Sequence, residues 1–229
     1  MTEGANQYIT PVSIILAGGL IGLGVYFGGG IQTGSKTPTG EAPESTVAFK
    51  EVGKDDHILG NPDAAVKVIE YSDFDCPYCR VFHKTMKSII EEYGKDGDVA
   101  WVYRHLPLDQ LHPNARKKSE ASECVASLGE NAAFWSFADK IFESEGNPDL
   151  TLLPAFAKES GVDEAKFNEC LNSGRTAELV KEDEADAVKI GARGTPHSII
   201  TTGEKSMPVS GAVPLESMKQ LIDQALADL

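Results

Sequence analysis

The segment Cys76-Pro77-Tyr78-Cys79 constrains the fold of this chain more than any other feature. It follows an apolar, strand-like run, Val66 to Tyr71, and precedes a run whose apolar residues have helical spacing. Two cysteines separated by two residues can exchange between a dithiol and a disulfide without movement of the backbone. At the first turn of a helix, unpaired N–H groups and the helix dipole stabilise a thiolate at Cys76. The segment therefore predicts a redox site where a strand meets a helix.

Further strands and helices are expected on both sides of this junction. The pattern predicts strands over residues 47–52, 65–72 and 99–106, and a helix over residues 79–93. Between Leu111 and Ile190 no segment reads as a strand, and Gly and Pro breakers divide this region into about five helices. A strand pair, 196–202 and 205–209, and a last amphipathic helix follow. The sequence predicts an α/β domain over residues 47–229, with a helical insertion at about 111–190.

The N-terminal region has the composition of a membrane anchor. After a short tail, residues 1–8, the segment 9–31 is uncharged and mostly apolar, and it is long enough to cross a bilayer as a helix. A cleaved signal peptide and a buried core helix are the alternatives, but the tail has no Lys or Arg for a signal peptide. Residues 32–46, rich in Gly, Ser, Thr, Pro and Glu, are expected to form a flexible linker.

The charge of the chain says more about its class of partner than about its orientation in a membrane. The net charge of -14 speaks against nucleic acid as a partner, because a phosphate backbone requires a basic surface. Lys36, beyond the apolar segment, mildly favours a domain on the cytoplasmic side. Disulfide chemistry favours the opposite side, and on that ground the domain is expected outside the cell membrane.

The run Tyr71 to Arg80 (YSDFDCPYCR), the helical insertion and Gly194-Thr195-Pro196 together resemble the DsbA-like thiol–disulfide oxidoreductases of the thioredoxin superfamily. The resemblance covers residues 47–229 and implies a thioredoxin-like fold with an inserted helical domain, here preceded by a transmembrane helix. It implies that Cys76 is the exposed, attacking cysteine and Cys79 the resolving one.

The same resemblance implies a substrate-binding surface around the two cysteines. Pro196 is expected to be cis and to expose the backbone of Thr195, which then pairs with a substrate peptide as an added strand. The alternative is an ordinary trans proline at the start of a strand. Pro77, which costs nothing at the first turn of a helix, and Tyr78 complete this surface.

Glu70 is a carboxylate on the strand that is predicted to be central. Burial of a carboxylate is costly unless it is used or paired. The resemblance implies that Glu70 lies beneath Cys79 and accepts its proton; a core carboxylate satisfied by a lysine is the alternative. His105, His112 and Tyr103 are expected to be packing or surface residues.

Cys124 and Cys170 lie in the helical region without a CxxC partner. In an oxidising compartment two such cysteines commonly pair, so a structural disulfide is expected; two buried free thiols are the alternative. A metal site at Cys76, Cys79 and His83 would offer three ligands, and structural zinc normally takes four. No metal or cofactor is therefore predicted.

These observations favour an enzyme, a membrane-anchored, extracytoplasmic oxidoreductase that forms disulfides in exported proteins. Its expected partners are exported proteins with thiols and, by resemblance, a quinone-linked membrane protein that reoxidises it; the enzyme itself is expected to be monomeric. A reductase or isomerase, or a metal- or peptide-binding module without turnover, are the alternatives.

Overall fold

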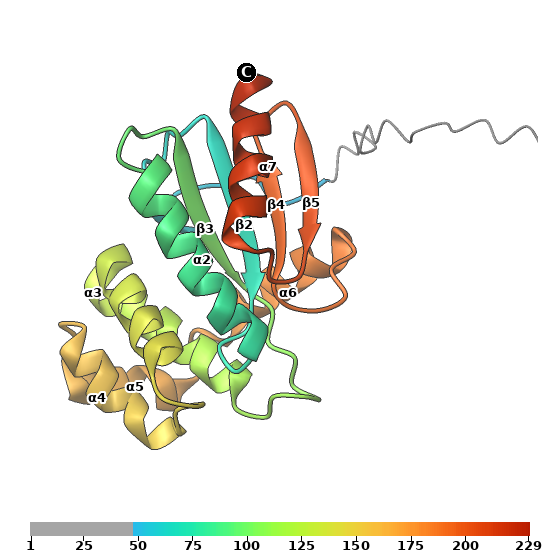
Figure 1. Cartoon of the computed structure of the whole chain (residues 1–229). Coiled ribbons are helices and arrows are strands. Elements are labelled where there is room, and N and C mark those ends of the chain that lie inside the picture. The colour runs from blue at the N-terminus through green and yellow to red at the C-terminus, as the bar shows by residue number, and fades with distance from the viewer. Residues whose placement is uncertain (1–47) are drawn as a thin grey trace, which may run out of the picture. The chain divides into compact units, whose positions relative to one another are not determined.

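A five-stranded mixed sheet lies at the centre of residues 48–229, the part of the chain that the computed structural model describes (Figure 1). The strand order is β1-β3-β2-β4-β5, with β2 and β3 parallel and the remaining neighbours antiparallel. The strands are β1 (His57–Gly60), β2 (Val66–Ser72), β3 (Val99–His105), β4 (His197–Thr201) and β5 (Ser206–Ser210).

The middle strands are covered on both faces because their sequences are apolar on both faces. On β2, Val66 and Val68 join a core with the helices α2 (Pro77–Tyr93) and α7 (Leu215–Ala227). Ile69 and Tyr71 point to the opposite face, where they pack with Ala187 of α6 (Ala177–Lys189). The expectation that the strand before the CxxC segment is central is confirmed.

The helical insertion forms a separate group at one end of the sheet (Figure 1). It consists of α3 (Ala115–Glu143), the 3-10 helix η1 (Leu150–Leu152), α4 (Leu153–Glu159) and α5 (Glu164–Ser173), and α6 leads back to β4. Helix α3 is kinked at Glu130, whose φ of 64° lies in the left-handed region that side chains disfavour. The kink follows Gly129, one of the breakers in the sequence, so the insertion has about the expected number of helical stretches.

The prediction of a strand over residues 47–52 is wrong for the residues described. Residues 48–56 contain no strand, and the edge strand β1 begins at His57 instead. The N–H of Gly53 donates to the Asp56 carboxylate at 2.8 Å, and the N–H of Lys50 donates to the Asp186 carboxylate at 2.8 Å. Because side chains satisfy these backbone groups, the segment runs as an ordered loop beside the sheet.

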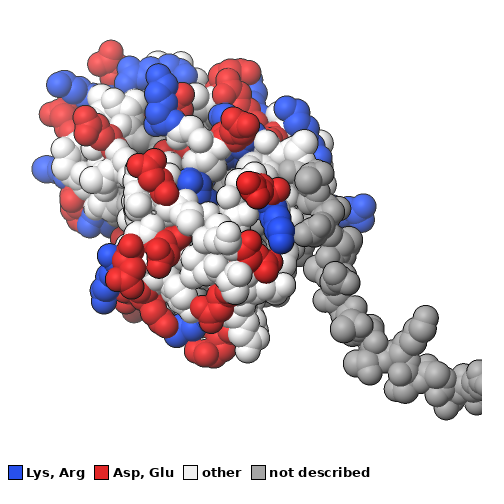
Figure 2. Space-filling view, turned by 90° about the horizontal axis from the view of Figure 1, so that it is seen from above, with Lys and Arg blue, Asp and Glu red and all other residues white. Residues whose placement is uncertain are grey.

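The predicted membrane anchor and linker lie outside the described residues. Among residues 48–229, each helix is too short or too polar to span a bilayer. On the face of the domain shown in Figure 2, acidic and basic side chains are interspersed. The excess of acidic residues in the chain is therefore not gathered into a single field on that face.

Candidate active site

The two cysteines of the CxxC segment lie at the beginning of α2. Cys76 has extended backbone angles and is the N-cap residue, and Pro77 occupies the first helical turn, where its missing N–H costs nothing. The first intrahelical bond runs from the N–H of Arg80 to the carbonyl of Cys76 at 3.2 Å. The sulfur of Cys76 therefore faces the unpaired N–H groups of the helix start.

Cys76 carries a thiol that ionises easily. The Cys79 thiol donates a hydrogen bond to it, and the backbone N–H groups of Cys79 and Tyr78 add further stabilisation. These interactions outweigh desolvation and lower the pKa of Cys76 to about 5. Cys76 is less exposed than expected, with 4% of its surface accessible.

Cys79 lies one turn deeper and is fully buried. Desolvation, its hydrogen bond to Cys76 and the nearby charge of Glu70 hold the pKa of Cys79 well above its usual range. Its sulfur also accepts the backbone N–H of Asp73 at 3.4 Å. The two sulfurs are free thiols with opposite pKa shifts, so one proton is shared unequally between them.

Glu70 lies on β2, below the CxxC segment, and only 1% of its surface is exposed. One carboxylate oxygen accepts the indole N–H of Trp101 at 2.9 Å, whereas the other, Oε1, is buried and has no hydrogen-bond partner among residues 48–229. Burial raises the pKa of Glu70 to about 7, and the charge of Cys76 adds to the shift. The alternative interpretation paired Glu70 with a lysine, but the side chain that contacts its carboxylate is Trp101.

The loop that carries Gly194-Thr195-Pro196 reaches the same site from the other end of the chain. The Thr195–Pro196 peptide bond is cis, and the Cys76 sulfur lies 3.4 Å from the Thr195 carbonyl oxygen, to which it donates when it is protonated. β4 follows directly and pairs with β2, which places this loop beside the start of α2. Of the other expected substrate-binding residues, Tyr78 is 65% exposed and Pro77 is also at the surface.

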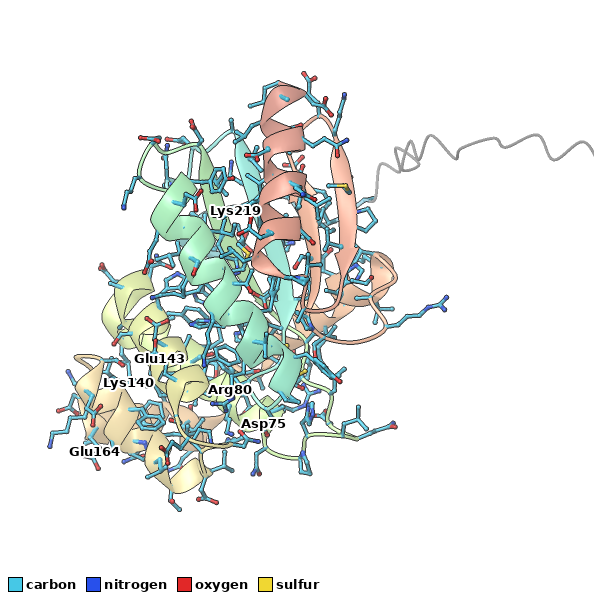
Figure 3. The ribbon with its side chains drawn as sticks, in the orientation of Figure 1. Asp75, Arg80, Lys140, Glu143, Glu164 and Lys219 are labelled. Atoms are coloured by element: carbon cyan, nitrogen blue, oxygen red, sulfur yellow. A yellow bond between two sulfur atoms is a disulfide. The ribbon has the colours of Figure 1, made fainter. Side chains whose placement is uncertain are left out.

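The loop before Cys76 is fixed by contacts that the sequence did not indicate. The Asp73 carboxylate accepts the N–H of Asp75 at 2.7 Å, the N–H of Leu108 at 2.8 Å and Nδ1 of His112 at 2.8 Å. Asp75 pairs with Lys118 of α3, a fully buried lysine. Asp75 and Arg80 lie close to the start of α2 in Figure 3. His112 was expected to pack or to face solvent, and its ring contacts the Asp73 carboxylate of this loop.

Arg80 and His83 connect α2 with the insertion. Nη1 of Arg80 donates to the Phe142 carbonyl at 2.7 Å, at the end of α3. Nε2 of His83 contacts the Asp139 carboxylate at 2.7 Å, so His83 faces the insertion.

Comparison with known proteins identifies the family. A family model described as thioredoxin matches residues 53–224. Solved structures with the same fold include DsbA2 of Pseudomonas aeruginosa, with 26% identity, a TM-score of 0.64 and coverage of 79% of this chain and 99% of that one. The α-DsbA1 of Wolbachia pipientis is 27% identical, with a TM-score of 0.67 and coverage of 77% and 94%. The chain is a DsbA-like thiol–disulfide oxidoreductase.

Other relatives show the same domain in different contexts. Oxidised BdbD of Bacillus subtilis shares the fold, with a TM-score of 0.69 at 24% identity and coverage of 79% and 98%. A Na(+)/H(+) antiporter NhaA 1 of Salinispora arenicola is 30% identical over 172 residues, which are 75% of this chain and 25% of the antiporter. The chain thus spans about a quarter of the length of that relative.

The DsbA-like domain contains a second cysteine pair, away from the redox site. Cys124 of α3 and Cys170 of α5 form a disulfide with a Cα–Cα distance of 5.8 Å. Both residues are fully buried. The bond joins two helices of the insertion and leaves Cys76 and Cys79 as the free cysteines of the described residues.

Proposed function

We propose that this DsbA-like oxidoreductase works as an oxidase, which forms disulfides in exported proteins while anchored to the membrane by residues 9–31. The observation that carries the direction is the position of Cys76 at the helix N-cap, with the Cys79 thiol donating to its sulfur. A stabilised Cys76 thiolate favours the reduced enzyme over the oxidised one. The oxidised enzyme is then a strong oxidant of substrate thiols.

The first step joins enzyme and substrate. A substrate thiolate attacks the sulfur of Cys76 in the Cys76–Cys79 disulfide, the bond between the two cysteines breaks, and its electron pair leaves on Cys79. Because the pKa of Cys79 lies well above neutrality, this sulfur takes up a proton. We assign the delivery of that proton to Glu70, whose pKa of about 7 keeps part of the carboxyl groups protonated at neutral pH.

The second step releases the oxidised substrate. A second thiolate of the substrate attacks the substrate sulfur of the mixed disulfide, and Cys76 leaves as a thiolate with the electron pair. Its pKa of about 5 makes Cys76 a good leaving group at neutral pH. The substrate has then lost two electrons and the enzyme holds a dithiol.

Substrate recognition is assigned to the surface around Cys76. The Thr195 backbone beside the cis proline would pair with an extended substrate segment, and Tyr78 would contact its side chains. Such contacts select for an unfolded, extended chain more than for a sequence. DsbA-like proteins act on thiols of exported proteins, and a quinone-linked membrane protein is the reoxidising partner that we propose.

The reduction potential of the Cys76–Cys79 pair tests the direction of the reaction. The full chain is equilibrated with glutathione buffers and the dithiol is trapped by alkylation. We expect a value nearer to about -120 mV, as in strongly oxidising enzymes, than to about -270 mV, as in thioredoxin. A value near that of thioredoxin would support the reductase alternative instead. Rapid oxidation of a reduced model protein would exclude a binding module without turnover. The membrane anchor is tested separately, by fractionation of cells into membrane and soluble proteins.

A further inference from the structure

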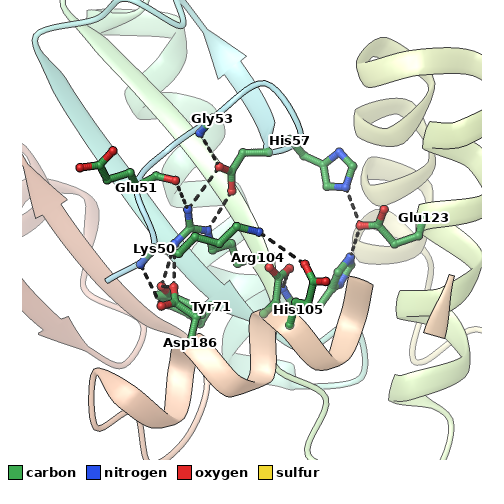
Figure 4. Close-up of polar contacts among 12 residues, drawn as sticks. Lys50, Glu51, Gly53, His57, Tyr71, Arg104, His105, Glu123 and Asp186 are labelled. Atoms are coloured by element: carbon green, nitrogen blue, oxygen red, sulfur yellow. Dashed lines mark hydrogen bonds and ion pairs between the residues drawn. The ribbon is translucent and has the colours of Figure 1, made fainter. Parts of the chain in front are cut away.

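Two histidines and a glutamate meet on the insertion side of the sheet, and the redox mechanism does not use them. His57 of β1 and His105 of β3 both direct Nε2 at the same oxygen of Glu123, which lies on α3 (Figure 4). The distances to Oε1 are 2.6 Å from His57 and 2.9 Å from His105. All three residues are more than nine-tenths buried. The three donor atoms lie within 4.8 Å of one another.

We propose that His57, His105 and Glu123 form a binding site for one divalent transition-metal ion of the Zn²⁺ type. Two imidazoles and one carboxylate are a ligand set that zinc takes in proteins, with a further position left for water or another ligand. Tetrahedral zinc holds neighbouring N and O ligands roughly 3.3 Å apart, as the usual bond lengths of about 2.0–2.2 Å require. The two hydrogen bonds therefore need to open by less than about 1 Å to admit the ion.

Two of the three proposed ligands face a cavity through which an ion and water can reach them. His57 and Glu123 line a cavity of about 560 Å³, together with the carboxylates of Asp183, Asp55 and others. The Asp183 carboxylate accepts the backbone N–H of His105 at 2.9 Å, which places a second acidic group next to the cluster. Glu123 and Asp183 thus place two carboxyl groups beside the position that a cation would take.

The donor set selects the class of metal. Calcium and magnesium prefer six or more oxygen ligands, whereas imidazole nitrogen suits zinc, copper and nickel. The ion would bridge β1 and β3 of the sheet to α3 of the insertion, and so fasten the two parts together. His105 also lies against Phe74, which is two residues before Cys76, with ring centroids 6.0 Å apart. We assign a structural role to the ion and no reaction.

A metal titration of the full chain tests the site. The protein is oxidised first, so that Cys76 and Cys79 form a disulfide and offer no thiolate ligands. After treatment with EDTA, Zn²⁺ is added and binding is followed by calorimetry and by thermal unfolding. We expect one Zn²⁺ per chain, a higher Tm, and much weaker binding of Ca²⁺. Absence of saturable Zn²⁺ binding would overturn the proposal and leave the cluster as a group of hydrogen-bonded side chains.

Variants locate the bound ion. His57→Gln and Glu123→Gln each remove one ligand and should weaken Zn²⁺ binding by more than about tenfold, since loss of an outer-shell partner alone costs that much. Asp55→Asn changes an exposed carboxylate of the same cavity and should bind Zn²⁺ like the parent protein. Equal binding by all three variants would contradict the proposal.

A measurement on the unaltered chain covers the case in which a variant fails to fold. Co²⁺ bound at this site should give visible absorption typical of nitrogen and oxygen ligands. X-ray absorption of the Zn²⁺ form should show two imidazoles and no sulfur. Sulfur ligands, or a shell of oxygen alone, would place the ion elsewhere and overturn the assignment.

Discussion

The two cysteine pairs of this protein are equally buried, but their surroundings differ in kind. Cys79, Cys124 and Cys170 are all inaccessible to solvent, and Cys76 is nearly so. Cys76 is surrounded by donors from Cys79 and the start of α2, which stabilise negative charge on sulfur. The sulfur of Cys124 instead has a weak contact with the Thr176 hydroxyl at 3.7 Å. Donors at the helix start, and not exposure, therefore distinguish the reactive pair from the structural pair.

The largest expected effect separates the two pairs by activity. Cys76→Ser should abolish disulfide transfer to a reduced model protein, because no sulfur remains to form the mixed disulfide. The matched control, Cys124→Ala with Cys170→Ala, should keep transfer close to that of the parent at a temperature where it is folded. Loss of transfer in the folded control would mean that the second pair takes part in the exchange.

The pH dependence of the alkylation rate tests whether Cys76 is the reactive cysteine of its pair. The rate at Cys76 should be half-maximal near pH 5 and level at neutral pH, since the pKa of this thiol is lowered to about 5. A Cys76 that titrates like a free thiol, near about 8.5, would remove the physical basis of the proposed oxidase.

Stability should respond to the structural pair. Loss of the Cys124–Cys170 bond, which closes a loop with a sequence separation of 46, should lower the free energy of unfolding by about 2–4 kcal/mol. Denaturant unfolding of the double alanine variant measures this difference. Reduction of the Cys76–Cys79 disulfide should not give a comparable loss, because the thiolate at Cys76 favours the reduced form. If reduction of Cys76–Cys79 lowered the free energy of unfolding more than loss of Cys124–Cys170 does, the roles that we assign to the two pairs would be wrong.

The smallest effect concerns Glu70. The pKa of this carboxyl is raised from 4.5 to about 7 in the folded chain, so the folded state binds the proton more tightly than the unfolded state. Stability of the parent protein therefore falls as pH rises from about 4.5 to about 7. Glu70→Gln removes this loss and should be the more stable protein at neutral pH, by up to about 3 kcal/mol.

The comparison of Glu70→Gln with the parent is made on oxidised proteins, in which neither Cys76 nor Cys79 titrates. Unfolding at pH 4 and at pH 8 then isolates the carboxyl group. The same variant, when reduced, should be reoxidised more slowly, because Cys79 lacks its proton acceptor. Unchanged stability and unchanged reoxidation would leave Glu70 as a core residue without a catalytic part.

Local patterns in the sequence predicted the parts of the fold that depend on neighbouring residues. The strand before Cys76, the helix after it and the central place of β2 follow from short apolar periodicities and from the spacing of two cysteines. The breakers in the insertion likewise located its turns, including the kink that follows Gly129 in α3. The edge strand β1 was misplaced because the backbone of residues 48–56 is satisfied by distant and local carboxylates, which periodicity does not encode.

The polar contacts around the site could not be predicted in the same way. Glu123 meets His57 from 66 positions away, and Lys118 meets Asp75 from 43 positions away. A lone histidine or lysine in a sequence carries no sign of such a partner. His105 was expected to pack or to face solvent; it packs, and its imidazole also contacts Glu123. Only the fold brings these groups together.

The three hydrogen bonds that the Asp73 carboxylate accepts affect how selective the enzyme is among substrates. Because the Asp73 carboxylate is hydrogen-bonded to Asp75, Leu108 and His112, this loop has little freedom to change its conformation when a substrate binds. We expect the incoming chain to do the adapting, and a polypeptide that has not yet folded can do so at low cost. A rigid enzyme that binds unfolded substrates would accept many different proteins. Its substrate range would become narrower as those proteins complete their folding.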